Sequence, residues 1–122
     1  MKRLIEIRTY RLKPGVADAF HHAMHSLAVP MLKKWDTDVV AYGHTDHEEA
    51  TYFLIRSYEN REALDCEQNA FYASSEWKYG PRKELVDRLD SYMNTLIWVS
   101  QEAINSMREL NAPEILTKGS KK

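Results

Sequence analysis

The sequence contains few of the residues that mark several common classes of functional site. Its single cysteine, Cys66, cannot form a disulfide within the chain, and a metal site built from several cysteines is excluded. Its four glycines are scattered among 122 residues, and none belongs to a glycine-rich loop that would hold nucleotide phosphates. We therefore expect neither disulfide cross-links nor a phosphate-binding loop.

An excess of one charge and long apolar runs are also lacking. The 17 basic and 18 acidic residues are mixed along the chain and give a net charge of -1, which argues against a broad nucleic-acid surface. No uninterrupted apolar run approaches membrane-spanning length, and charges return at Glu6 and Arg8, unlike in a signal or transit peptide. These features predict a cytoplasmic protein that binds neither nucleic acid nor membrane.

The stretch IEIRTYRLKPG, residues 5 to 15, predicts the first strand. Apolar or small side chains alternate with polar and aromatic ones, which is the period of two that a half-buried strand shows. Pro14 cannot donate a backbone hydrogen bond to a sheet, and Gly15 permits a turn, so the strand should end there. The other half of the alternation needs an explanation, because it consists of Glu6, Arg8 and Tyr10.

The remaining segments predict two helical regions and three more strands. Apolar residues at helical spacing indicate a helix over residues 16 to 31, which Pro30 kinks or ends. Asn60 is a good cap for a second helical region, which Ser74 or Ser75 restarts. Aromatic and β-branched segments indicate strands over residues 37 to 46, 51 to 58 and 92 to 100.

The order of these elements is strand, helix, strand, strand, helix, strand. It predicts an α+β, ferredoxin-like βαββαβ fold, with one antiparallel sheet and helices on one face. We assign residues 1 to 100 to this domain. Residues 101 to 122 form a C-terminal extension, which we expect to be partly helical and then frayed.

Two helices cover only one face of such a sheet, so the other face must meet water, a ligand or another subunit. We expect the helices to cover the apolar set, which is Ile5, Ile7, Phe53 and Ile55. The uncovered face would then carry Glu6, Arg8, Tyr10, Leu54, Arg56 and Tyr58. A second copy stacked on that face would cover its aromatic surface and enclose a cavity lined by Arg, Tyr and Glu. The sequence therefore predicts a homodimer.

The same residues resemble the opening of NIPSNAP-type domains. The first strand of those domains reads Leu-Arg-Thr-Tyr with Lys-Pro-Gly close behind, and Ile7-Arg8-Thr9-Tyr10 and Lys13-Pro14-Gly15 match it here. The resemblance covers residues 4 to 100 and includes Glu76 and Trp77 in SSEWKYG. The chain departs from the pattern at Ser75, where those domains have a proline, and its tail has no counterpart there.

This resemblance implies a dimeric α+β barrel, in which two ferredoxin-like sheets pack face to face. The wider superfamily includes small cofactor-free monooxygenases, decarboxylases, dehydratases and haem-degrading enzymes. NIPSNAP-type domains themselves mostly lack an established activity. We therefore expect no cofactor, and the resemblance names no substrate.

Arg8, Tyr10, Arg56 and Tyr58 form the preferred ligand-binding group, because they repeat an Arg-x-Tyr spacing on two strands that should be neighbours. Guanidinium groups suit a carboxylate or an enolate, and tyrosines suit a flat ring. A simpler interpretation stays open, in which Glu and Arg pairs only decorate a solvated sheet. No catalytic residue is assigned.

Three more residues complete the candidate set. Glu6 could act as a base or neutralise an arginine, and Asn94 lies on the fourth predicted strand. His44, near the end of the second strand, could act as a general base or be an ordinary surface histidine. His21 and His25 have the helical spacing that can hold a metal, but no third ligand is evident nearby, so we expect no metal site.

Two functions from different classes stay open. The first is a dimer with a small-molecule pocket between sheet and helices, acting as a cofactor-free monooxygenase-like or isomerase/lyase-like enzyme on a small organic anion or aromatic ligand. The second is a non-catalytic dimeric scaffold or interaction module, in which the tail from Glu102 to Leu110 docks on a partner chain.

Overall fold

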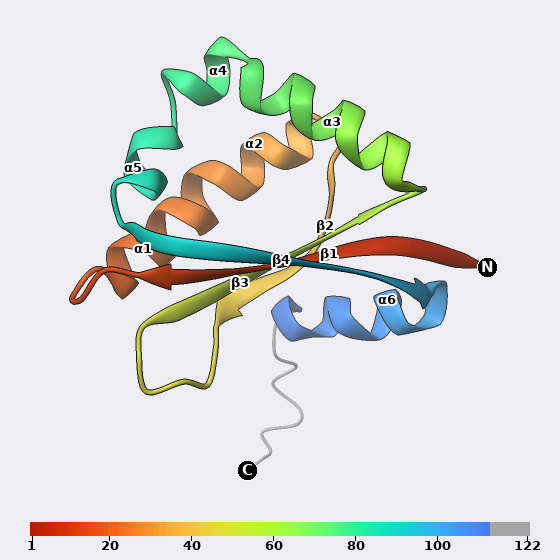
Figure 1. The fold of residues 1–122 in the computed structure, drawn as a ribbon, viewed down its shortest axis with the longest axis horizontal. Helices are drawn as coiled ribbons and strands as arrows, with labels where there is room; N and C mark the ends of the chain where they lie inside the picture. Colours follow the sequence, from red (N-terminus) through yellow and green to blue (C-terminus); the bar gives the residue numbers. More distant parts are fainter. Residues whose placement is uncertain (113–122) are drawn as a thin grey trace.

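The computed structural model describes residues 1 to 112, so the predicted frayed end of the chain lies outside the described residues. One antiparallel sheet of four strands has the order β2-β3-β1-β4 (Figure 1). The strands are β1 (Lys2–Leu12), β2 (Asp38–His44), β3 (Thr51–Tyr58) and β4 (Leu89–Ser100). This arrangement confirms the predicted ferredoxin-like α+β fold.

The connection from β1 to β2 is helical and contains one wide turn. It consists of α1 (Ala17–Ala23), the π-helical turn η1 (Met24–Ala28) and α2 (Val29–Lys34). Pro30 lacks an N–H and its ring crowds the preceding turn, and the wide turn before it relieves this crowding. In that turn the N–H of Val29 donates to the carbonyl of Met24. Leu27 is one of the apolar residues at helical spacing that predicted this helix, but the wide turn shifts that spacing and leaves Leu27 44% exposed.

The connection from β3 to β4 lies on the same face of the sheet (Figure 1). It contains α3 (Arg61–Ala73), α4 (Ser75–Lys78) and α5 (Arg82–Val86). The side chain of Asn60 accepts a hydrogen bond from the N–H of Ala63, and that of Ser74 accepts one from Trp77, so both predicted caps are confirmed. None of the helices in residues 1 to 112 has the length and apolarity to span a bilayer.

The main core lies between these helices and the sheet, and it corrects the predicted orientation of the strands. Tyr10, Tyr52 and Leu54 of the sheet pack with Phe20 and Phe71 of the helices. The alternate set of strand residues therefore faces the helices, and it includes Glu6, Arg8, Tyr10, Arg56 and Tyr58. The apolar set, which was predicted to face the helices, lies on the opposite face, so the prediction was wrong.

Part of the opposite face is covered by the segment that follows β4. This segment forms α6 (Gln101–Met107) and the short helix η2 (Arg108–Asn111), and α6 lies across the sheet from the other helices (Figure 1). Ile104 of α6 is fully buried against Ile5, Val40, Ala41 and Ile55. The tail that was considered for docking on a partner therefore packs on its own sheet.

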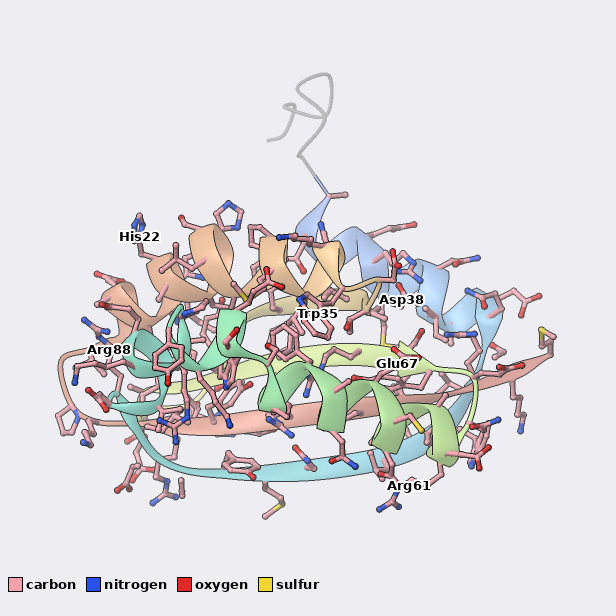
Figure 2. The ribbon with its side chains drawn as sticks, turned by 90° about the horizontal axis from the view of Figure 1, so that it is seen from above. His22, Trp35, Asp38, Arg61, Glu67 and Arg88 are labelled. Carbon is pink, nitrogen blue, oxygen red and sulfur yellow. The ribbon has the colours of Figure 1, made fainter. Side chains whose placement is uncertain are left out.

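Polar contacts hold the end of this segment at the edge strand β2. Asp38 lies beside α6 (Figure 2), and Arg108 Nη2 donates to its Oδ2 over 2.8 Å. The side-chain amide of Asn111 pairs with both the N–H and the carbonyl of Tyr42, each over 2.8 Å. This amide therefore satisfies backbone groups that an edge strand would otherwise leave unpaired.

The rest of the opposite face is open and carries several large apolar side chains. Met93 and Ile97 on β4 are 70% and 42% exposed, and Ile7 and Phe53 beside them are half-buried. The register places Met93 and Phe53 on either side of Thr9, so these side chains share one face of the sheet. Large apolar side chains that adjoin one another at the surface often mark an interface.

Candidate functional site

A buried ion pair joins the two central strands. Glu6 on β1 and Arg56 on β3 stand directly opposite each other in the register, and they are 0% and 1% exposed. Arg56 donates to Oε1 of Glu6 through Nε over 2.9 Å and through Nη2 over 2.6 Å. Burial removes the hydrogen bonds that water would make to the carboxylate. The two donors of Arg56 replace them and hold the carboxylate in place.

Arg8 adds a second cation to the same carboxylate. Residues 6 and 8 lie on one face of β1, and Arg8 Nη2 donates to Oε2 of Glu6 over 3.1 Å. Asn94 lies on β4 directly opposite Arg8, and it accepts a hydrogen bond from Nε of Arg8 over 2.8 Å. The guanidinium also lies over the ring of Tyr92, with its carbon 4.8 Å from the ring centroid. These contacts hold the Arg8 head group in one place.

Tyr72 links this cluster to helix α3, and it is the residue that the sequence analysis missed. Its hydroxyl oxygen accepts from Nη1 of Arg8 over 3.2 Å and from Nη1 of Arg56 over 2.9 Å. Gln68, one helical turn earlier, donates to the hydroxyl of Tyr58 over 3.0 Å. Gln68 and Tyr72 are four residues apart, so they lie on one side of the helix. A polar residue and a tyrosine on the side that faces the sheet could have identified Tyr72 from the sequence.

The cluster carries an excess positive charge. The two guanidiniums and the one carboxylate sum to a net charge of +1. Burial alone would lower the pKa of Arg56, but Tyr72, Tyr58 and Glu6 outweigh burial and raise that pKa. Burial raises the pKa of Tyr58 to about 12, and burial together with Tyr72 raises the pKa of Tyr10. Both of these phenols therefore keep their protons at neutral pH.

A cavity of about 410 Å³ lies between the sheet and helices α1, α3 and α5, beside this cluster. Its polar side is formed by Arg8, Tyr10, Gln68, Asn69, Tyr72 and Arg82. Its apolar side is formed mainly by Phe20, Met24, Trp77, Leu85 and Leu89. None of the described residues that line it is acidic, so an anion entering it meets cations and hydroxyls but no carboxylate.

The structure brings six of the seven candidate site residues together. Arg8 and Tyr10 line the cavity, Glu6 and Asn94 bond to Arg8, and Arg56 bonds to Glu6. The sixth, Tyr58, is buried beside Arg56 under α3. The seventh, His44, lies apart from these six, at the end of β2 in a separate group of histidines.

That separate group joins histidines of α1 and η1 to the edge of the sheet. Nδ1 of His21 and the hydroxyl of Tyr52 are 2.6 Å apart, and the ring centroid of His44 lies 5.2 Å from that of His21. Burial, His44 and His25 together lower the pKa of His21. Within residues 1 to 112, no set of three His, Cys, Asp or Glu side chains is placed to hold a metal ion.

Comparison with known proteins identifies the family. The NIPSNAP family model matches residues 5 to 101. The chain belongs to the NIPSNAP family. A NIPSNAP-like domain protein from Burkholderia xenovorans is 20% identical, with a TM-score of 0.73 over 81% of this chain and 86% of that one. A NIPSNAP family protein from Agrobacterium tumefaciens is 18% identical, with a TM-score of 0.74 over 80% of this chain and 88% of that one.

The NIPSNAP fold is shared more widely. A candidate antibiotic biosynthesis monooxygenase from Nitrosomonas europaea is 11% identical, with a TM-score of 0.62 over 81% of this chain and 91% of that one. No curated protein matches the chain. At these identities the likenesses show a common fold, so a function for this NIPSNAP protein has to be argued from its own side chains.

Removing the carboxylate at the centre of the cluster tests its structural role. We expect Glu6→Gln to lower the free energy of unfolding by about 3 to 5 kcal/mol, because two buried guanidiniums would lose their counter-charge. Urea denaturation measures this change. The matched control is Glu49→Gln, which removes an exposed partner of Arg11 and should cost less than about 1 kcal/mol. Equal losses in the two variants would contradict the analysis.

The lowered pKa of His21 predicts a pH dependence of stability. In the unfolded chain His21 has its ordinary pKa of 6.5, whereas the pKa in the folded chain is lower, so the folded chain binds that proton only at lower pH. The free energy of unfolding therefore decreases as the pH falls below 6.5, and it increases again as the pH rises. Denaturation at several pH values should show wild type losing more stability than His21→Asn on acidification. Parallel curves for the two proteins would refute this assignment.

Proposed function

We propose that this protein binds a small organic anion with a flat or aromatic body in the cavity between its sheet and its helices. The observation that carries this proposal is that Arg8 has N–H donors that its protein partners leave unused. A guanidinium has five N–H donors, and Arg8 uses one of them for Asn94, one for Tyr72 and one for Glu6. One N–H on each terminal nitrogen is left for a ligand, which suits the two oxygens of a carboxylate.

The rest of the cavity suits an apolar ligand body. Its volume of about 410 Å³ lies within the usual range for small-molecule sites. Phe20, Met24 and Trp77 supply an apolar surface opposite the polar cluster. The excess charge of the cluster supports a monoanion, because one carboxylate would bring the net charge of the site to zero.

We propose that the bound anion is a substrate, in a cofactor-free reaction of the monooxygenase or isomerase/lyase kind. Two features support an enzyme: the fold is that of a candidate antibiotic biosynthesis monooxygenase, and two tyrosine hydroxyls stand beside Arg8 at the cavity. The scaffold alternative is less favoured, because the segment expected to dock on a partner buries Ile104 in its own sheet.

We also propose that two copies associate through the open apolar face of the sheet. The supporting observation is the group of Met93, Ile97, Ile7 and Phe53, which α6 leaves uncovered. A second copy related by a two-fold axis would bury the same group on both subunits. This face lies across the sheet from the cavity, so each subunit would keep a cavity of its own.

Calorimetric titration with phenylacetate tests the proposed site. Wild type should bind phenylacetate at least tenfold more tightly than the neutral phenylacetamide, because only the acid forms charge-assisted hydrogen bonds with Arg8, worth roughly 1.5 kcal/mol or more. Arg8→Gln should remove this preference.

The control for this titration is Arg11→Gln, which changes an exposed arginine of the same strand. It should bind both compounds as wild type does. If wild type binds neither compound, or binds the acid and the amide equally, the proposed site is wrong.

Sedimentation velocity tests the association. Met93→Glu places a charge on the open face. It should convert the dimer to a folded monomer at micromolar concentration. Tyr79→Glu changes a side chain that is 90% exposed and lies outside this face, and it should leave the dimer intact. A wild type that sediments as a monomer would contradict the proposal.

A further inference from the structure

The hydroxyl of Tyr72 has a donor that the protein itself does not use. A hydroxyl donates one hydrogen bond and can accept two. The oxygen of Tyr72 accepts from Arg8 and from Arg56, and guanidinium groups cannot accept a hydrogen bond in return. Within residues 1 to 112 its O–H donates to no protein group, although Tyr72 lines the cavity. The proton is therefore available to a ligand.

The two guanidiniums also make this proton a strong donor. Hydrogen bonds that follow one another in a chain polarise each other, and the effect is larger when the outer donors are charged. Arg56 is almost wholly buried and Arg8 is held by three partners, so neither guanidinium is free to leave the oxygen of Tyr72. The hydroxyl is thus fixed in position and polarised before any ligand arrives.

The position of this hydroxyl relative to Arg8 limits what it can recognise. The oxygen of Tyr72 lies 3.2 Å from Nη1 of Arg8, which is also one of the nitrogens with an N–H left for a carboxylate. The hydroxyl of Tyr72 can therefore reach only the carboxylate oxygen on Nη1 itself or a further ligand oxygen that lies close to the carboxylate. An oxygen on the carbon next to a carboxylate meets this requirement, whereas an oxygen at the far end of the ligand does not.

We propose that the ligand is a 2-oxo or 2-hydroxy carboxylic acid with an apolar body, and that Tyr72 is the residue that recognises its second oxygen. The inference rests on the proposed function, because it takes the carboxylate on Arg8 as given. The second oxygen is neutral, since one carboxylate already balances the net charge of +1 on the buried cluster. Arg82 also lines the cavity, but it is exposed, so water screens its charge more than the charges of the buried cluster.

Two probe acids that differ in one oxygen test this inference. Benzoylformate carries a keto oxygen next to its carboxylate, and phenylacetate has the same ring and carboxylate without that oxygen. Wild type should bind benzoylformate about tenfold more tightly in calorimetric titrations, which is the effect of one hydrogen bond worth roughly 1.4 kcal/mol. Tyr72→Phe should bind the two acids equally, because it lacks the hydroxyl that would donate to the keto oxygen.

Each outcome of this experiment decides something. Equal affinity for the two acids in wild type, or a preference that survives in Tyr72→Phe, overturns the inference and leaves the proposed function standing. A loss of both affinities by the same factor in Tyr72→Phe also overturns it, because that result assigns Tyr72 only a role in positioning Arg8. Tyr79→Phe, which changes an exposed tyrosine remote from the cavity, should keep the preference. Failure of wild type to bind either acid instead contradicts the proposed function itself.

Discussion

A carboxylate that loses its water must find its counter-charges inside the protein, and this constraint organises the structure around Glu6. The residue is fully buried in the central strand β1, so it needs a cation beside it. Arg56, directly opposite on the neighbouring strand β3, is that cation. Tyr72 then ties Arg56 and Arg8 to α3. The polar half of the first strand is thus a buried framework that sets the position of the helix above it.

The same constraint gives the site its chemistry. One carboxylate cannot balance two guanidiniums, so the cluster beside the cavity keeps a positive charge. Arg56 is buried within the framework and does not line the cavity, whereas Arg8 lines the cavity and has N–H donors left for a ligand. The anion site that we propose therefore depends on a structural ion pair with one extra cation.

The strands, the two helix caps and most of the site residues could be predicted from the sequence, because period-two alternation and capping residues are local signals. The face of the sheet that the helices cover could not be predicted. Alternation divides the side chains of a strand into two sets, but it does not show which set faces the helices. Ile5 and Ile7 were expected to face the helices, but the ion pair of Glu6 with Arg56 lies there instead, and Ile5 is buried on the opposite face beneath α6. The contacts of Tyr72 with Arg8 and of His44 with His21 could not be predicted, because they join parts of the chain that are far apart in sequence.

The buried pairing of Arg56 with Glu6 is the central claim, and the exchange of the Arg56 Nε–H with solvent tests it most directly. Hydrogen exchange followed by NMR at the guanidinium Nε should show Arg56 strongly protected, because its Nε–H donates to Glu6 at a site that is 1% exposed. The Nε–H of Arg11, whose side chain is 56% exposed, should exchange rapidly in the same spectrum. Exchange at Arg56 as fast as at Arg11 would show that the ion pair is open to water and would contradict this account.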